Sequence, residues 1–404
     1  MELINGSITT PLGFTANSIH CGIRKNKSKP DLSLMYCEVP CTAAAVHTSN
    51  AVKGAPNIVT AENLADGIAQ GMICNSGIAN TCAADGIDKA KAMCTLAGTA
   101  LGIRPEDVIV ASTGVIGPSI DLEPIKSGIQ KLKESLSRDG GNNAALGIMT
   151  TDTHPKQVCV RFELEGKTCY IGGMAKGSGM IMPNMATMLC FLTTDVKITA
   201  EMLRIALKET VDDTFNMVSV DGDTSTNDMC SIMASGLAEN KEISTSDESF
   251  DLFVKALKTA LTYLSKQIAA DGEGATKLIE CNVCGASDIK TAKTVAKSVI
   301  NSALLKAAMF GADANWGRVL CAIGYSGASV DVNKIDVSFA SSKGSIIVCV
   351  NGAGIDFDED KAKEILLEKE VEINIDLKQA DHSATAWGCD LTYDYVRING
   401  DYRS

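Results

Sequence analysis

The segment AKGSGMIMPNMATMLCFLTTD, residues 175–195, sets a single cation, Lys176, on a glycine-rich turn ahead of an apolar run. The run is interrupted at Pro183 and Asn184 and resumes from Thr187 with the composition of a buried β-strand. Because of that interruption, even this longest apolar stretch is too short to cross a bilayer, and a membrane span is excluded. From composition alone, we expect the strand to lie inside a sheet, with the Thr187 hydroxyl bonded to a neighbouring carbonyl.

Outward from this segment, strand-like and helix-like patterns alternate along the chain. Apolar, β-rich runs predict strands at 71–77, 107–113, 157–166, 187–195, 334–340 and 344–352. Helical periodicity predicts helices at 87–102, 201–213, 250–269 and 291–309. Helices interleaved with strands, in a chain with only 4% aromatic residues, favour a layered α/β fold over an all-β sandwich.

Length and charge limit the number of domains and the kinds of partner that the protein can have. A chain of 404 residues predicts two domains or one large α/β unit. Its net charge of −12 argues against nucleic acid or anionic lipid as a partner, because phosphate binding needs clustered positive potential. Residues 1–186 carry 16 basic and 16 acidic side chains, so the whole net charge lies in residues 187–404. The N-terminal residues lack a basic region followed by an apolar core, so we expect no secretory signal.

Cysteine usage predicts the compartment. The 15 cysteines are odd in number and scattered from Cys21 to Cys389, which is typical of a reducing cytoplasm rather than a disulfide framework. One CxxC pair, Cys281 and Cys284, lies in an apparent strand, where residues three apart point to opposite faces. We therefore expect two core thiols there and no metal site.

Motifs for several other chemistries are missing. The four histidines (20, 47, 154 and 382) form no HExxH motif, and no GxSxG elbow, Walker A motif or strand-borne GxGxxG occurs. The acidic run DGDTSTND, residues 221–228, departs from a calcium loop, with Thr226 where glycine is needed and Ile232 where glutamate is needed. Its Ser, Thr, Asn and Asp residues instead predict a turn that leads into a helix N-cap.

Seven motifs nevertheless follow one another in a recognisable order. KGSGMIMPNMATMLCFLTTD is joined by ASTGVIG (111–117), MTTDTHPK (149–156), VDGDTSTND (220–228), ADGEGATKLIE (270–280), GADANWGR (311–318) and the tail AWGCDLTYDYVRINGDYRS. Together they resemble the ornithine acetyltransferases, also called glutamate N-acetyltransferases, of the arginine pathway. The resemblance runs from NSGIANTC near residue 75 to the last residue, so it covers nearly the whole chain.

The resemblance implies that the chain cuts itself between Ala186 and Thr187. The Thr187 hydroxyl would attack the Ala186 carbonyl, the acyl group would move from nitrogen to oxygen, and water would hydrolyse the ester. The new α-amine of Thr187, with a reference pKa of about 7.7–8.0, could then act as the base for its own hydroxyl. This explains a nucleophile that needs no His or Asp partner.

The resemblance also assigns the other site residues. Oxyanion stabilisation falls to Thr113 and Gly114, where the glycine lets the backbone approach closely. The substrate contacts are Thr150, Lys176, Thr187, Glu273, Asn399 and Ser404. Lys176 suits an α-carboxylate and Glu273 a substrate ammonium group. The family usually ends in Thr, whereas this chain ends in Ser404, which keeps the hydroxyl and loses a methyl group.

The implied reaction is a double displacement in a cytoplasmic enzyme without metal or cofactor. Thr187 would take the acetyl group from N-α-acetylornithine, release ornithine, and pass the acetyl group to glutamate, giving N-acetylglutamate. A bifunctional member would also take acetyl groups from acetyl-CoA. The fold implied is an α/β sandwich shared by an alpha chain (1–186) and a beta chain (187–404), interleaved in one fold, and the family commonly assembles two copies of each.

Two other readings remain open. A threonine aminopeptidase with the same self-cleaving fold would hydrolyse its substrate rather than transfer an acetyl group. A binding protein that never cleaves would stay a single chain. The formation of N-acetylglutamate from acetylornithine separates the first reading from the transferase, and the number of chains separates the second.

Overall fold

The computed structural model describes residues 1–182 and 188–401. Within this part of the chain, nine strands form one hydrogen-bonded sheet in the order β1-β6-β7-β8-β10-β3-β4-β5, with β2 paired to β3. These strands are β1 (Glu2–Leu3), β2 (Phe14–Ile19), β3 (Leu32–His47), β4 (Ile68–Ile78), β5 (Val108–Val115), β6 (Lys156–Leu164), β7 (Lys167–Lys176), β8 (Leu189–Thr194) and β10 (Met229–Ala234). The strands predicted at 71–77, 107–113, 157–166 and 187–195 correspond to β4, β5, β6 and β8.

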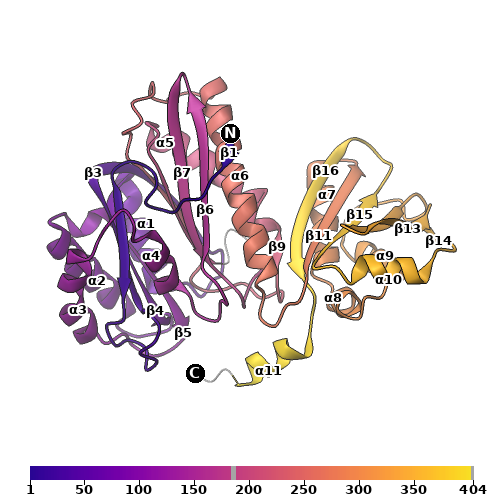
Figure 1. The fold of residues 1–404 in the computed structure, drawn as a ribbon, viewed down its shortest axis with the longest axis horizontal. Coiled ribbons are helices and arrows are strands. Elements are labelled where there is room, and N and C mark those ends of the chain that lie inside the picture. The colour runs from indigo at the N-terminus through magenta and orange to yellow at the C-terminus, as the bar shows by residue number, and fades with distance from the viewer. Residues whose placement is uncertain (183–187, 402–404) are drawn as a thin grey trace.

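The long strand β3 folds this sheet over into two layers. Its first half pairs with β2 and β4, and its second half, Thr42–His47, pairs with β10. The pairing with β4 slips between Tyr36 and Cys41, around Pro40, which has no N–H to give to a ladder. Figure 1 accordingly shows β4 and β5 in one layer and β6 and β7 in the next.

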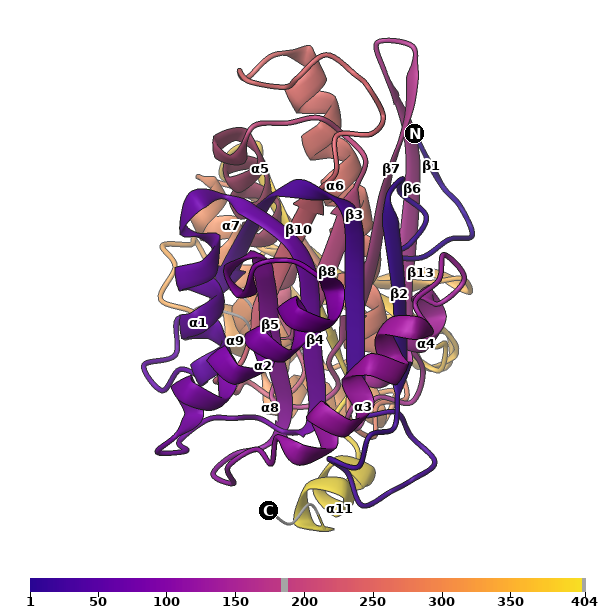
Figure 2. The same cartoon turned by 90° about the vertical axis from the view of Figure 1, so that its left-hand side faces the viewer.

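Helices cover both outer faces of this β-sandwich. The helices α1 (Ala55–Asn63), α2 (Gly86–Leu101) and α3 (Glu123–Glu134) pack against alternate residues of β4 and β5. The helices α5 (Ala200–Asp212) and α6 (Glu248–Ala270) pack against alternate residues of β6, β7, β8 and β10. Between the two sheet layers lies a separate core to which α4 (Gly141–Ile148) contributes. Met72 of β4 and Phe191 of β8, which are not sheet neighbours, share that core. The layered α/β fold is therefore confirmed (Figure 2).

The second sheet is built entirely from the C-terminal half of the chain. In the described residues its order is β14-β13-β12-β15-β11-β16-β9. Its strands are β9 (Val218–Ser219), β11 (Leu278–Ala286), β12 (Asp336–Ser341), β13 (Gly344–Val350), β14 (Ala353–Gly354), β15 (Glu370–Asp376) and β16 (His382–Cys389). Its helices are α7 (Ile289–Ile300), α8 (Ala303–Phe310), α9 (Trp316–Gly324) and α10 (Glu359–Leu366), and α11 (Tyr393–Asp401) closes the described chain. The remaining elements are the short 3-10 helices η1 (Leu64–Asp66), η2 (Pro105–Asp107) and η3 (Phe215–Met217).

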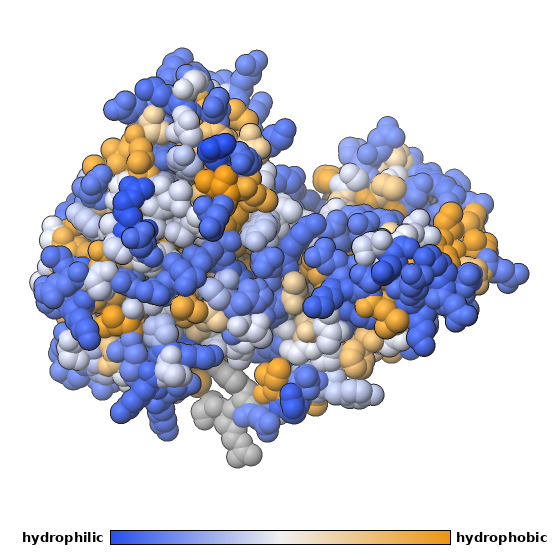
Figure 3. All heavy atoms as spheres, viewed as in Figure 1, coloured by the Kyte–Doolittle hydropathy of each residue, from blue (hydrophilic) through white to orange (hydrophobic). Residues whose placement is uncertain are grey.

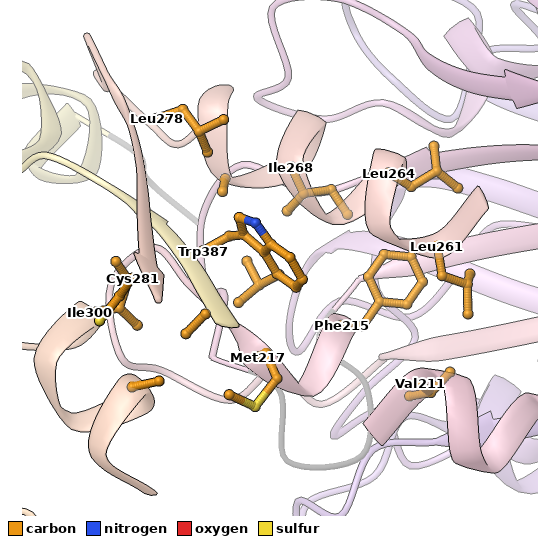
Figure 4. Close-up of a cluster of buried hydrophobic side chains, with 14 of the residues drawn as sticks. Val211, Phe215, Met217, Leu261, Leu264, Ile268, Leu278, Cys281, Ile300 and Trp387 are labelled. Atoms are coloured by element: carbon orange, nitrogen blue, oxygen red, sulfur yellow. The ribbon is translucent and has the colours of Figure 1, made fainter. Parts of the chain in front are cut away.

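A buried cluster joins the two sheets. Trp387 of β16 lies between α6 and the second sheet, with Phe215 and Leu264 on one side of it and Cys281 on the other (Figure 4). Its indole N–H donates to the Glu280 carboxylate at 2.9 Å, which satisfies the one polar atom of the ring. The surface of the two lobes in the view of Figure 1 is mostly hydrophilic, with small separate hydrophobic patches (Figure 3).

Three sequence predictions are wrong. Of the two thiols expected in the core, Cys281 is buried but Cys284 is exposed, because residues three apart in the strand β11 face opposite sides of the sheet. The helix predicted at 291–309 is two helices, α7 and α8, because Ser302 caps the second one by accepting from the Leu305 N–H at 3.3 Å. The run 221–228 leads into the buried strand β10 and not into a helix. Its first residue, Asp221, accepts hydrogen bonds from the backbone of Met180 and Ile181, which are distant in sequence, as well as one from the nearby Asp223 N–H. Among the described helices, none is long and apolar enough to cross a membrane.

Candidate active site

The residues assigned by resemblance that lie in the described part of the chain converge on one cavity of about 160 Å³. The cavity is lined by Thr113, Gly114, Thr150, Thr151, Lys176, Gly179, Met180, Ser225, Glu273 and Asn399. They come from segments far apart in the sequence, including the ends of β5 and β7 and the helix α11. The fold of β3 brings the ends of β5 and β7 to the same end of the sandwich.

Gly114 has a conformation that needs glycine. Its φ is +131°, in the region that residues with a Cβ rarely adopt, and it faces Gly77 of β4 in a parallel pair. A Cβ at Gly114 would collide with the backbone of Gly77. The two strands can approach this closely because Gly114 lacks a side chain, and Thr113 and Gly114 both line the cavity.

Lys176 reaches across the cavity to Thr113. The Lys176 Nζ lies 3.3 Å from the Thr113 Oγ1 and donates a hydrogen bond to it. Because Lys176 fills an acceptor position of that hydroxyl, the O–H proton of Thr113 is free to point into the cavity. Burial lowers the pKa of the Lys176 ammonium, while the carboxyl groups of Asp152 and Asp228 act in the opposite direction.

A buried ionic network supports this side of the cavity. The Lys156 ammonium is fully buried and lies 2.7 Å from Asp152 and 2.6 Å from Asp271. Asp152 also accepts from the backbone N–H groups of Thr150 at 3.0 Å and Gly177 at 2.8 Å, which fixes the two segments beside Lys176. Burial alone would raise the pKa of Asp152, but the Lys176 and Lys156 ammonium groups outweigh it, so this pKa lies below that of a free aspartate.

The cavity is also lined by an acidic side chain, Glu273. The Glu273 carboxylate accepts a hydrogen bond from the Asn399 side-chain amide at 2.8 Å, and the Glu273 N–H donates to the Ser178 carbonyl at 2.9 Å. A Cβ on Gly179 would meet that carboxylate, so the Glu273 side chain packs directly against the turn at Gly179. A substrate in the cavity would thus meet both a cation, Lys176, and an anion, Glu273.

Asp228 is a buried carboxyl beside the cavity that the sequence did not single out. It is 2% exposed, and within the described part of the chain its Oδ2 atom has no hydrogen-bond partner. Burial raises the pKa of Asp228 well above its usual range, although the hydroxyl of Ser225 and the charge of Lys176 lower it. Sequence reasoning missed Asp228, and also Asp152 and Lys156, because isolated charges in polar stretches look like solvated residues until the fold buries them.

Three of the predicted site residues, Ala186, Thr187 and Ser404, lie outside the described residues. The chain on both sides of the predicted cleavage point is described. Met182, before it, accepts a hydrogen bond from the Thr224 hydroxyl at 2.8 Å. Met188, after it, accepts one from the Met229 N–H at 2.8 Å, and β8 then runs between β7 and β10. Leu189 is paired with Lys176, so this flank adjoins the cavity.

Comparison with known proteins gives a consistent picture. Residues 15–404 match the model of the ArgJ family. The arginine biosynthesis bifunctional protein ArgJ of Caldanaerobacter subterraneus is 51% identical over 100% of both chains. The arginine biosynthesis bifunctional protein ArgJ 1 of Clostridium acetobutylicum is 48% identical over 100% of this chain and 98% of that protein. A crystal structure of the arginine biosynthesis bifunctional protein argJ from Bacillus halodurans matches with a TM-score of 0.50 and 48% identity, covering 52% of this chain and 98% of the solved chain.

Proposed function

The chain belongs to the ArgJ family, and from this premise we propose that it is an acyltransferase of arginine biosynthesis that moves an acetyl group from N-α-acetylornithine to glutamate. The observation that carries the proposal is the cavity, in which six residues named by the resemblance meet. Its opposed charges, Lys176 and Glu273, suit a small amino acid with a carboxylate at one end and an ammonium group at the other.

We place the nucleophile at Thr187, after cleavage of the Ala186–Thr187 bond. The α-amine freed by cleavage would take the proton of the Thr187 hydroxyl as it attacks the acetyl carbonyl, and would give that proton to the departing ornithine amine. Two facts support the cut. β8 begins two residues later beside Lys176, and the solved relative matched over 98% of its length corresponds to only about half of this chain.

Thr113 and Gly114 would stabilise the oxyanion of the tetrahedral intermediate. The Thr113 hydroxyl can donate into the cavity because it already accepts from Lys176. The Gly77–Gly114 contact holds the backbone here in one conformation before the substrate arrives. Donors fixed in advance in this way lower the barrier, and losing one typically costs about 2.7–4 kcal/mol.

Glutamate would enter the same cavity for the second half-reaction and leave as N-acetylglutamate. The names of the relatives add a second activity, since they are called bifunctional. We propose that acetyl-CoA can replace acetylornithine as the acetyl donor. We further propose that the two chains, 1–186 and 187–404, stay interleaved and assemble as two copies of each, since β8 and β10 complete a sheet whose other strands precede residue 187.

A single assay separates transfer from hydrolysis. Purified protein with N-α-acetylornithine and glutamate is expected to form N-acetylglutamate and ornithine in equal amounts, and Thr187→Ala to form neither. Release of acetate or of amino acids from peptides, without N-acetylglutamate, would instead support the aminopeptidase reading.

A further inference from the structure

The loop between β2 and β3 carries the densest group of cations in an acidic chain. Arg24, Lys25, Lys27 and Lys29 fall within the six residues RKNKSK, without an acidic residue among them, although the protein has a net charge of −12. The three lysines are exposed, and none forms an ion pair with any other residue that the structure describes. Their charge is therefore available to an anion from solution.

This loop is fixed at its base. The buried Asp31 carboxylate accepts backbone hydrogen bonds from Cys21 at 2.7 Å and Arg24 at 2.9 Å. The Arg24 guanidinium donates to the Met149 carbonyl, and a Cβ on Gly77 would meet the Arg24 side chain. The loop is thus anchored in a defined position, whereas its lysines remain in solvent.

The anchoring residues also place the loop at the mouth of the cavity. Met149 directly precedes Thr150, which lines the cavity, and Gly77 is the strand partner of Gly114, which also lines it. Arg24 therefore contacts Met149 and Gly77, and each of these is directly next to a residue that lines the cavity. In Figures 1 and 2 the dark indigo loop before β3 lies at the same end of the molecule as α11, which supplies Asn399.

The two sides of the mouth differ in charge. On the far side Glu273 lines the cavity and Asp221 binds the backbone of Met180, with Asp223 two residues further along. On the other side, Arg24 bonds to Met149, next to Thr150, and anchors the loop that carries the three lysines. Opposite charges at one opening direct a cationic group to the first side and an anionic group to the second.

The cavity is too small for a whole coenzyme A thioester, so the phosphate groups of such a donor would lie outside it. A cavity of about 160 Å³ can hold an acetyl group and an amino acid. It cannot hold a coenzyme A thioester, because even ordinary drug-sized ligands fill about 300–1,000 Å³. With only the acetyl end of such a donor inside, its flexible pantetheine arm must lead the phosphates out to the surface around the mouth, and lysines are common phosphate ligands.

We propose that the loop Arg24–Lys29 binds the phosphate groups of a coenzyme A thioester while its acetyl end occupies the cavity. The inference rests on the proposed function, because Thr187 accepts the acetyl group. In that step a bond forms between the Thr187 oxygen and the acetyl carbon, the carbon–sulfur bond breaks, and the hydroxyl proton passes through the α-amine to the departing thiolate. Acetylornithine has no phosphate and would not need the loop.

The test compares two triple variants of the full protein. The loop variant reverses the charge of the three loop lysines and is Lys25→Glu/Lys27→Glu/Lys29→Glu. The control variant makes the same charge change at exposed lysines that do not line the cavity and is Lys208→Glu/Lys241→Glu/Lys343→Glu. We expect the loop variant to raise KM for acetyl-CoA by about tenfold or more, and the control to change it less than about twofold. The loop variant should leave KM for acetylornithine and for glutamate, and kcat with acetylornithine, close to those of the parent.

A donor without phosphates supplies the second comparison. S-acetylpantetheine carries the thioester and the arm of acetyl-CoA but no phosphate, so its kcat/KM should be the same in the parent and the loop variant. The kcat/KM of acetyl-CoA should exceed that of S-acetylpantetheine in the parent and fall toward it in the loop variant. Titration calorimetry with coenzyme A should show the same loss of binding in the loop variant. Free ADP tests whether the loop binds the phosphates of the acetyl donor. ADP should then inhibit the reaction with acetyl-CoA and leave the reaction with acetylornithine unchanged.

Three outcomes would overturn the inference. The first is equal KM for acetyl-CoA in the loop variant and the control, and the second is an equal loss with S-acetylpantetheine. The third is a parent that neither binds coenzyme A nor takes acetyl groups from it, which would leave the acetylornithine reaction standing. Conversely, a parent that binds coenzyme A through the loop but makes no N-acetylglutamate from acetylornithine would contradict the proposed function and not the loop.

Discussion

The ammonium group of Lys176 and the hydroxyl of Thr113 lie 3.3 Å apart, although 63 positions of sequence separate them. The contact joins the ends of β7 and β5, which belong to different layers of the sandwich. It links a group suited to a substrate carboxylate with a group suited to an oxyanion. The roles proposed for the two residues, in substrate binding and in acyl transfer, therefore meet in one cavity, and each can be tested separately.

Lys176→Met should weaken substrate binding. Methionine keeps much of the length of the side chain but removes the charge, and losing a charged hydrogen bond of about 1.5–3 kcal/mol predicts a ~10- to 100-fold rise in KM for acetylornithine. Lys167→Met, on the same strand but exposed, should leave KM unchanged. Steady-state kinetics of the two variants measures the difference, and an unchanged KM in Lys176→Met would remove this residue from the binding site.

Gly114→Ala should impair catalysis and destabilise the protein. The added methyl group would enter a backbone with φ of +131° and collide with Gly77. Such strain costs about 1–3 kcal/mol, and a displaced oxyanion donor lowers kcat by ~100-fold or more.

Gly102→Ala is the matched control for this change. Its φ is also positive, at +74°, but no atom lies within 4 Å of the added Cβ. We expect a modest loss of thermal stability and normal kcat. If both alanine variants kept full kcat, the turn at Gly114 would have no role in transition-state stabilisation.

Glu273→Gln should separate the two substrates. Glutamine keeps an oxygen that can accept from Asn399 but loses the negative charge that faces a substrate ammonium group. KM for acetylornithine should rise ~10- to 100-fold, while KM for glutamate stays constant or falls. An equal rise for both substrates would mean that Glu273 serves only to hold Asn399.

Asp228→Asn should change how stability depends on pH. Because the folded pKa of Asp228 is raised, the folded chain keeps a proton that the unfolded chain releases above its ordinary pKa. Unfolding is then favoured increasingly as pH rises toward the folded pKa, by at most about 1.4 kcal/mol per pH unit. The amide has no such proton, so the variant should melt with the parent near pH 4 and above it at pH 8.

Thermal melts of parent and variant across pH 4–8 check this prediction. A variant that melts below the parent by a constant amount would show that the hydrogen bonds of this carboxyl group, such as the one with Ser225, stabilise the fold. Burial of the Asp228 carboxyl would then not be a net cost to folding.

The sequence predicted the layers of the fold better than their connections. Strands such as β4 and β5 follow from short, mostly apolar runs, because strands that are buried on both faces need such runs. The apolar periodicity of residues 291–309 predicted one continuous helix. The structure has two, because Ser302 caps the N-terminus of α8 even though the apolar face continues past it. The bend of β3 around Pro40 could not be predicted, because it depends on which strands pair on either side of it.

For the site, the resemblance supplied residue identities, and the fold shows what surrounds them. Thr113, Lys176 and Glu273 meet at one cavity, and nothing in their spacing along the chain required this. The supporting residues Asp152 and Lys156 lie in the motif MTTDTHPK, but the resemblance assigned a role to neither of them. Their importance comes from burial, which turns an ordinary ion pair into a fixed support for Lys176.

The most direct test of the central claim is the intact mass of the purified protein under denaturing conditions. We predict two polypeptides that end at Ala186 and begin at Thr187, the second gaining one acetyl group when acetylornithine is added without glutamate. Thr187→Ala should instead give a single chain of 42.4 kDa that is never acetylated. A parent protein that remains one intact chain while forming N-acetylglutamate would contradict the account.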